Sequence, residues 1–452
     1  MELSKVFADD LKPVVIVERL ENGLSQVTSK NLVLVTDLPV SSDITDLCTM
    51  FDEAMPQWGE AFGVASSEWI DAHPKACLIV DRQRFIDLKY ITPDVPTFRE
   101  GYQLQDRLFM LEQPSPYYRR HLLLHEGTHW FLWKFLGGNG PPWFSEGMCE
   151  MMATHQRSEK GNVFRLNWIP TDRESVPFWG RLKVIRDSMA AQTAPSLDRI
   201  LQFGDAAHLT DEPYCWSWAA MVFFLNNVRC SEDLKQAFLP NLKGHVGTEH
   251  KLSQEFKDKL RSLWPDIQAE WTVFVNELDY GFSLEHSMPK IELSQQVKLA
   301  NSVTAKVRAN HGWQTTGVRV LQGDRISILA TGRVVIRNDR VHGSTAPPKQ
   351  VASESQTWKS EPQGITLQYI HHFPLGKLIA VIIPTETQLA ESDMTIPLTP
   401  FAVGNSCEYT AEKSGILLMK LNESSDGLFD NSGEYSVTIA RASNGLQARP
   451  DP

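Results

Sequence analysis

The sequence predicts an α+β protein, because three stretches of its 452 residues carry different patterns. Residues 1–105 alternate apolar, strand-like runs with an amphipathic helix, whereas residues 106–280 are mainly helical in pattern. From residue 297 onward, apolar and polar residues alternate between Gly-Asp turns, which is typical of an antiparallel β-sandwich. A chain of this length needs more than one hydrophobic core. We therefore expect a small N-terminal α/β part at 1–105, a mainly helical domain at 106–280, a linker at 281–296 and an all-β jelly-roll or sandwich domain at 297–445.

The elements of the N-terminal part follow from short apolar runs. Val14–Val17 and Leu32–Val35 have the pattern of strands, and Asp43–Phe62 has that of an amphipathic helix. Ala76–Val80 is expected to be a buried strand, because nearly all of its residues are apolar. Arg107–Leu111 is expected to be a further strand, placed directly before the next helix.

That next helix has recognisable ends. Ser115-Pro116 suits an N-cap followed by proline at the first helical position, and Gly137-Gly138 suits the end. Apolar residues on more than one face predict that the helix is buried. Gly127 stands in its middle, where glycine costs about 1 kcal/mol relative to alanine. It indicates close approach by another backbone or a ligand, or a simple packing contact.

The helix carries His125, Glu126 and His129 in the pattern H-E-x-x-H. Two histidines four residues apart lie on one helical face, so both imidazoles can reach one Zn²⁺. Glu126 sits beside that face and can act as a general base. Because so short a pattern also arises by chance, the surrounding sequence has to decide.

A catalytic zinc site needs a third protein ligand. The pattern H-E-x-x-H-x-x-G-x-x-H is excluded, because Leu132 and Phe135 stand where Gly and His would be required. A Gly- and Pro-rich turn then lets a second helix begin near Trp143 and fold back on the first. Glu146 falls in the first turn of this helix and can point at the metal. Glu150 lies one turn further on the same face, where it can accept a hydrogen bond from the outer nitrogen of a ligand histidine.

The segments HEGTHW and WFSEGMCE together resemble the gluzincin metallopeptidases, and within them the bacterial peptidase-MA-like domains. The shared signature is H-E-x-x-H with a later W-x-x-E-G-x-x-E. The resemblance implies His125, His129 and Glu146 as zinc ligands, Glu126 as general base and Glu150 as a carboxylate that supports a ligand. The interval between His129 and Glu146 is slightly shorter than in the best-known gluzincins, and the turn can absorb the difference.

Further roles follow from the same resemblance. Arg107–Leu111 takes the place of an edge strand that pairs with extended peptide substrate, although it is also consistent with an ordinary sheet strand. Tyr214 takes the place of a tyrosine that stabilises the oxyanion, although a buried aromatic with a satisfied hydroxyl is the more common outcome. We expect His121 at the edge of the cleft rather than as a fourth ligand, and Cys149 as a small buried residue.

The C-terminal stretch resembles the calcium-dependent, galactose-binding bacterial lectins of the PA-IL type. The shared motifs are W-x-x-T-G from Trp313, G-D-x-I-x-I-x-A-x-G from Gly323 and D-N-S-G-x-x-S-V from Asp430. In that family the last loop supplies oxygen ligands to Ca²⁺, which suits a hard cation. The positions implied here are the side chains of Glu423, Asp430 and Asn431 and the carbonyl of Gly427.

Two features set this stretch apart from those lectins. In the loop, Glu423 replaces the usual Asp. The loop is also consistent with a turn whose Asp and Asn side chains cap their own backbone, without calcium. The sugar-contacting histidine of the lectins aligns near Ser360, which cannot do the same work, whereas their glutamine aligns with Gln363. The domain is therefore expected to be a binding module of altered specificity or a structural β-domain.

Composition narrows the class of partner. A net charge of −11 and the lack of a Lys/Arg-rich run argue against nucleic acid. No apolar stretch is long enough to span a bilayer. The six cysteines are scattered, which predicts free thiols. The start lacks the pattern of a signal peptide, so a cytoplasmic location is the default, while the domain architecture leaves an extracytoplasmic one open.

The sequence thus predicts a zinc metallopeptidase that acts on a peptide or protein substrate and carries a carbohydrate-binding-like module. That module would hold the enzyme near a glycan. Zinc is the expected cofactor and calcium a second candidate. Two alternatives stay open: a glycan-binding protein with an inactive metallopeptidase-like scaffold, and a zinc hydrolase acting on a non-peptide amide.

Overall fold

The computed structural model describes residues 15–158, 163–242, 249–299, 302–337, 357–370 and 372–442. The chain divides into two compact units. The first comprises residues 1–180, 203–221 and 234–255, and the second comprises 181–202, 222–233 and 256–452. Residues of the stretch 106–280 therefore occur in both units.

The first unit is built on a six-stranded sheet with the strand order β1-β2-β3-β4-β6-β5. Its strands are β1 (Ile16–Arg19), β2 (Ser25–Thr28), β3 (Val33–Thr36), β4 (Lys75–Ile79), β5 (Gly101–Leu104) and β6 (Arg107–Leu111). Strands β3, β4 and β6 run parallel, whereas β1, β2 and β5 pair antiparallel with their neighbours. Strands are thus found at all four apolar runs named in the sequence, with Val14 lying outside the described residues.

Of the two possibilities left open for Arg107–Leu111, the structure shows the ordinary sheet strand and excludes the edge strand. This strand, β6, lies between β4 and β5 and is paired on both sides. The edge strand at this end is β5, whose four residues are all half-buried. Strand order is decided by long-range pairing, so an apolar run in the sequence cannot show which strand stands at the edge.

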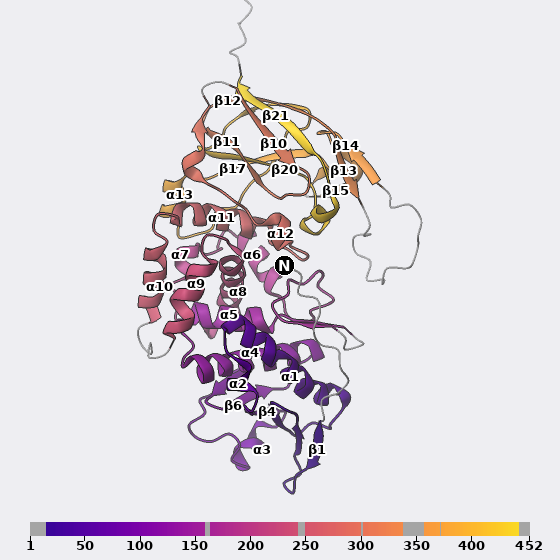
Figure 1. Ribbon diagram of the computed structural model, residues 1–452, viewed down its shortest axis with the longest axis vertical. Coiled ribbons are helices and arrows are strands. Elements are labelled where there is room, and N and C mark those ends of the chain that lie inside the picture. The colour runs from indigo at the N-terminus through magenta and orange to yellow at the C-terminus, as the bar shows by residue number, and fades with distance from the viewer. Residues whose placement is uncertain are drawn as a thin grey trace, which may run out of the picture. The chain divides into compact units, whose positions relative to one another are not determined.

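Three long helices position the site in the first unit (Figure 1). They are α1 (Ser42–Phe62), α4 (Pro116–Phe131) and α5 (Pro142–Ala153). Helix α1 contacts α4 at Gly127, where a Cβ atom would lie 2.7 Å from Trp58 Cη2 and 2.9 Å from Phe51 Cε2. Of the explanations for this glycine, packing against aromatic rings is the one the structure shows.

The other helices are short or lie in the middle of the chain. They are α2 (Ser66–Trp69), α3 (Arg82–Asp87), α6 (Arg181–Ala190), α7 (Leu197–Ile200), α8 (Asp211–Asn226), α9 (Ser231–Phe238), α10 (Glu249–Lys259), α11 (Trp264–Glu277), α12 (Leu284–Ser287) and α13 (Glu386–Glu391). Helices and several separate sheets together agree with the α+β class. Among the described residues, no helix is long and apolar enough to cross a membrane.

The second unit contains a β-sandwich, as the alternating pattern predicts. One sheet has the order β10-β21-β12-β19 and the other β18-β17-β20-β11-β9. The strands are β9 (Val297–Lys298), β10 (Val303–Arg308), β11 (Gln314–Val320), β12 (Arg325–Thr331), β17 (Leu378–Ile383), β18 (Phe401–Ala402), β19 (Ser406–Thr410), β20 (Gly415–Leu421) and β21 (Glu434–Arg441). Shorter pairs of this unit are β13 (Val334–Arg337) with β14 (Thr357–Ser360), and β15 (Ile365–Ile370) with β16 (Phe373–Leu375). The first unit has one such pair among its described residues, β7 (Gln156–Arg157) with β8 (Phe164–Arg165). Alternate residues of both sheets of the sandwich, such as Ile328 and Met419, fill one core between them.

Part of the outer face of the five-stranded sheet, on β17 and β20, is buried as well. Val381 and Leu418 pack there with Val273 of α11 and with Ile291 and Leu293. The last two belong to the expected linker, yet they are only 1% and 2% exposed. Burying an aliphatic side chain of this size stabilises a fold by about 1.5–3 kcal/mol. This part of the chain is thus held to the sandwich.

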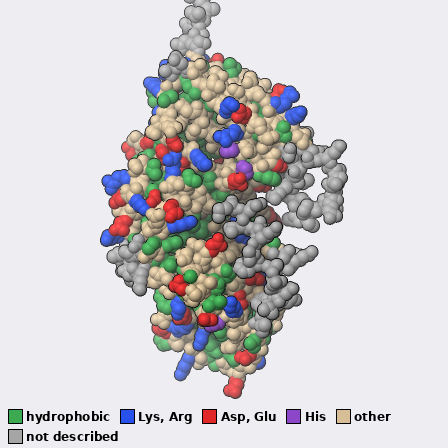
Figure 2. Space-filling model, in the orientation of Figure 1, with side chains coloured by type: hydrophobic (Ala, Val, Ile, Leu, Met, Phe, Trp, Pro, Cys, Tyr) green, Lys and Arg blue, Asp and Glu red, His purple; other side chains and the backbone are tan. Residues whose placement is uncertain are grey.

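Acidic and basic side chains are interspersed on the molecular face drawn in Figure 2, among the residues that are coloured there. On this face the acidic side chains do not gather into a single patch.

Candidate metal centre

Helix α4 begins and ends as the sequence predicts. Ser115 Oγ accepts a hydrogen bond from the N–H of Tyr118 at 3.0 Å, and Pro116 occupies the first turn. After Phe131 the helix continues through one π turn and ends at Gly137, whose φ is +80°. A glycine is favoured there because side chains rarely adopt this left-handed conformation. His125 and His129 thus stand one regular turn apart on one face.

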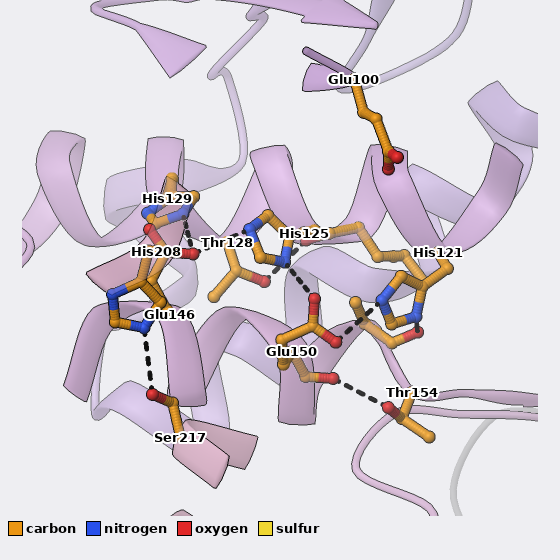
Figure 3. Close-up of polar contacts among 12 residues, drawn as sticks. Glu100, His121, His125, Thr128, His129, Glu146, Glu150, Thr154, His208 and Ser217 are labelled. Atoms are coloured by element: carbon orange, nitrogen blue, oxygen red, sulfur yellow. Dashed lines mark hydrogen bonds and ion pairs between the residues drawn. The ribbon is translucent and has the colours of Figure 1, made fainter. Parts of the chain in front are cut away.

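Helix α5 packs along α4 and presents its carboxylates to that face (Figure 3). It starts at Pro142, close to the predicted position. Gly147 permits close approach of α8, since a Cβ atom at Gly147 would overlap the carbonyl oxygen of Ser217. Helix α5, which carries Glu146 and Glu150, is therefore packed closely against both α4 and α8.

Three predicted metal ligands converge on one point. Glu146 Oε2 lies 3.2 Å from His125 Nε2 and 3.4 Å from His129 Nε2. One donor atom from each of these residues lies within 4.8 Å of the others, so the group can hold a metal ion. Glu146 Oε2 is buried and has no hydrogen-bond partner, although both imidazole nitrogens are near it. Two imidazoles and a carboxylate that converge in this way fit a cation such as Zn²⁺.

The electrostatics of this group also favour a positive charge. Burial by itself lowers the pKa of His125, but contacts with Glu146 and Glu150 outweigh it and raise that pKa to about 10. Burial raises the pKa of Glu146, but His129 and His125 outweigh it and hold that pKa well below its usual range. Without a metal, protons supply the positive charge that the carboxylates need. A metal ion would displace those protons, as metal binding does elsewhere.

Glu126 lies beside these ligands and belongs to neither of the metal-ligand groups found among the described residues. Its side chain is buried, and burial raises the pKa of its carboxyl although His125 and His129 act in the opposite direction. Glu126 faces the backbone of the edge strand β5. A Cβ atom at Gly101 of that strand would overlap Glu126 Oε1.

Glu150 lies beside Nδ1 of His125, the nitrogen at which a carboxylate can orient a ligand histidine. Its Oε1 lies 3.3 Å from His125 Nδ1, and its Oε2 lies 3.2 Å from His121 Nε2. His121, His125 and Glu150 form a second group able to hold a metal ion. The expectation that His121 lies at the cleft edge is wrong, because this residue is only 1% exposed. Its Nδ1 contacts the carbonyl oxygen of Ala153 at 3.1 Å, which draws the ring inward.

Tyr214 lies near the centre, and the structure adds His208 beside it. The Tyr214 ring is 6.1 Å from the His125 ring and 5.0 Å from the His208 ring. His208 Nε2 contacts Ser217 Oγ at 3.1 Å (Figure 3). Burial lowers the pKa of His208, partly offset by Glu146. Sequence reasoning missed His208, because a single histidine in a short turn (Ala207–Leu209) gives no periodic signal.

Cys149 is fully buried, as expected for a small core residue. Burial raises the pKa of its thiol well above the usual value. Among the described residues, the two groups able to hold a metal do not include it.

The predicted calcium loop of the sandwich brings some of its residues together. Asn431 Nδ2 donates a hydrogen bond to Glu423 Oε2 at 2.8 Å, and a Cβ atom at Gly427 would lie 2.5 Å from Glu423 Oε1. Burial raises the pKa of Glu423 to about 8, and the charge of Asp430 acts in the same direction. Asn431 Oδ1 is buried and has no hydrogen-bond partner.

This loop also packs against a segment of its own unit. The backbone N–H of Ser283 donates to Ser425 Oγ at 2.7 Å, and a Cβ atom at Gly281 would lie 2.9 Å from Asp426 Cβ. Of the two positions aligned with sugar contacts, Ser360 is buried and donates to the carbonyl of Glu361, whereas Gln363 is exposed.

Comparison with known proteins gives little that bears on this chain. No protein-family model and no curated protein matches it. One solved structure that matches is described as "EclA N-terminal domain; PllA-like lectin". It is 23% identical, the match covers 32% of this chain and 98% of that chain, and the TM-score is 0.21. This likeness is weak and partial.

Proposed function

We propose that this protein is a zinc-dependent metallopeptidase of the gluzincin type. The observation that carries the proposal is the convergence of His125, His129 and Glu146, with Glu126 buried beside them. The motif resemblance in the sequence points to the same four residues. Residues 125 to 146 thus supply both the ligands and a general base.

The donor set is that of a catalytic zinc site, in which three protein ligands leave one coordination position open. A zinc ion held there would act as a Lewis acid, polarising a carbonyl oxygen and lowering the pKa of a water molecule. Glu150 would orient His125 through its Nδ1, as carboxylates do for many ligand histidines.

Glu126 would hold the proton that moves during hydrolysis. Its carboxylate stands next to the ligands without being one of them, and its burial separates it from bulk water. A proton accepted at this carboxylate from the attacking water would then pass to the leaving amine. The neighbouring Gly101 leaves the space that this carboxylate occupies.

The edge strand β5 is the element most suited to a peptide substrate. It pairs with β6 on one side, and among the described residues no strand pairs with its other side. An extended peptide added along that side would form backbone hydrogen bonds with β5. It would also run close to Gly101, and therefore to Glu126.

Tyr214 would donate a hydrogen bond to the oxyanion that forms on the substrate carbonyl. Its ring lies beside that of His125, and the edge-on contact with His208 holds it there. This role concerns catalysis alone, and zinc binding does not depend on it.

The test begins with the metal content of the purified protein. We expect about one zinc per chain, its loss in Glu146→Ala and its retention in the matched control Cys149→Ser. Peptide cleavage should stop with a chelator and return with zinc. Zinc binding with cleavage of simple amides but not peptides would support a non-peptide amidase instead. No zinc, even after reconstitution, would remove the enzyme proposal.

We propose a second site for a calcium ion in the sandwich loop. Glu423 and Asn431 lie together in a buried position, and Asn431 Oδ1 has no partner there. Calcium binding to purified wild type and Glu423→Gln should be measured by calorimetry, with binding expected only in wild type. Galactose titrated with and without calcium then tests glycan binding. Sugar binding without any hydrolysis would favour the glycan-binding alternative, and no calcium binding would leave the sandwich a structural domain.

A further inference from the structure

A line of contacts runs beneath the candidate metal centre (Figure 3). It leads from the carbonyl oxygen of Ala153 through His121 and Glu150 to His125, with separations of 3.1, 3.2 and 3.3 Å. The carboxylate of Glu150 is thus held between two imidazoles. Only one of these imidazoles, that of His125, also faces Glu146 and the metal position.

Ala153 sets the direction of the first hydrogen bond along this line. A carbonyl oxygen can only accept, so His121 Nδ1 carries a hydrogen and points away from Glu150. The remaining nitrogen, Nε2, faces Glu150 Oε2, and the hydrogen bond between them uses a second hydrogen, carried by Nε2 or by the carboxyl group of Glu150. The ring orientation of His121 is therefore fixed at one end by the main chain, and its other end reaches the carboxylate.

Packing also restricts the rotation of the His121 and Glu150 side chains. His121 is 1% exposed, and its ring stacks on that of Tyr118 with 5.4 Å between centroids and 9° between planes. The backbone of Glu150 is held as well, because Thr154 Oγ1 donates to its carbonyl oxygen at 2.8 Å. Neither side chain can turn without breaking several contacts.

We propose that His121 is a positioning residue for the metal centre. It holds the carboxylate of Glu150, which in turn fixes the ring of His125 so that Nε2 faces the metal position. This inference rests on the proposed function, since it assigns a role toward the same metal. It adds a residue outside the H-E-x-x-H and W-x-x-E-G-x-x-E motifs.

Two substitutions separate hydrogen bonding from packing at this position. His121→Gln keeps a donor that can reach Glu150, whereas His121→Phe keeps the flat ring against Tyr118 but cannot bond to Glu150. The matched control is His155→Phe. His155 also stacks on a tyrosine, Tyr117, at 4.5 Å, and it forms hydrogen bonds with the carbonyl of Ala153 and with Arg120.

The measurement is the zinc affinity of each purified full-length variant, by competition with a chromophoric chelator. We expect His121→Phe to weaken affinity by about tenfold, the lower end of the effect of losing a ligand's supporting partner. His121→Gln and His155→Phe should stay within about twofold of wild type on the same scale. Thermal unfolding of the metal-free forms identifies any variant that fails to fold, and His121→Leu then replaces His121→Phe.

The outcomes distinguish this inference from the proposed function. Wild type that binds no zinc would overturn both. Wild type that binds zinc while His121→Phe binds equally well, or better than His121→Gln, would overturn only the positioning role. Two metal ions per wild-type chain, with one lost in His121→Phe, would show that His121 is itself a metal ligand. That result would also overturn the positioning role.

Discussion

Gly101 and Glu126 are in direct contact across the edge of the first unit's sheet. The backbone of Gly101 leaves no room for a side chain, because a Cβ atom there would overlap the carboxylate oxygen of Glu126. The strand proposed to hold substrate and the residue proposed to move a proton are therefore fitted to each other. The local sequence around Gly101 or Glu126 does not predict this contact.

Gly101→Ala should push the Glu126 carboxylate out of place. We expect kcat to fall while zinc stays bound, together with a loss of about 1–3 kcal/mol in the free energy of unfolding from overpacking. Peptidase kinetics and metal content measure the two effects. Gly204→Ala is the control, because nothing lies within 4 Å of the position its Cβ would take. Full activity in Gly101→Ala would contradict the proposed placement of Glu126.

Gly127→Ala should destabilise the protein although alanine is the better helix former. The new methyl would meet Trp58 and Phe51 at 2.7 and 2.9 Å. Overpacking of this kind lowers the free energy of unfolding by about 1–3 kcal/mol, whereas the higher helix propensity of alanine raises it by about 1 kcal/mol. Chemical denaturation should therefore show a lower free energy of unfolding. A more stable variant would mean that the aromatic rings can move aside.

His155 should make stability depend on pH in the acidic range. Burial lowers its pKa from 6.5 to about 3, and the charges of Arg120, His121 and Arg157 act in the same direction. Between these values the unfolded chain binds a proton that the folded chain does not. The free energy of unfolding should thus fall as pH drops from 6.5 toward 3, by about 1.4 kcal/mol per unit for this one group.

The check is urea denaturation of wild type and His155→Gln at several pH values. The variant should lose stability less steeply below pH 6.5, while above it the two curves should run parallel. Identical slopes below pH 6.5 would show that His155 is protonated in the folded protein.

Tyr214→Phe should separate oxyanion stabilisation from metal binding. Removing one oxyanion donor typically costs about 10²-fold or more in kcat. We expect a loss of that order with zinc affinity unchanged, because the variant keeps the ring that lies 6.1 Å from the ring of His125. Wild-type kcat in this variant would leave Tyr214 a packing residue.

The sequence was most informative where the site is local. His125, Glu126, His129, Glu146 and Glu150 all fall within 26 consecutive positions on two helices joined by one turn. Helical periodicity relates residues within each helix, and the short turn makes the helices antiparallel neighbours. Spacing was therefore enough to predict which side chains meet.

Long-range relationships were not predictable in this way. Gly101 and His208 reach the centre from segments that are 25 and 62 positions away from Glu126 and Glu146, respectively. The edge position of β5 depends on the order of all six strands. The inward turn of His121 depends on where α5 ends, because its partner is the carbonyl of Ala153.

Glu126→Gln tests the central claim most directly. The amide keeps the size of the side chain but cannot accept the proton, while the three ligands remain. Zinc content and peptide hydrolysis are measured on the same sample. The account predicts about one zinc per chain, as in wild type, with kcat reduced by about 10²–10⁴-fold. Hydrolysis at the wild-type rate with zinc bound would contradict it.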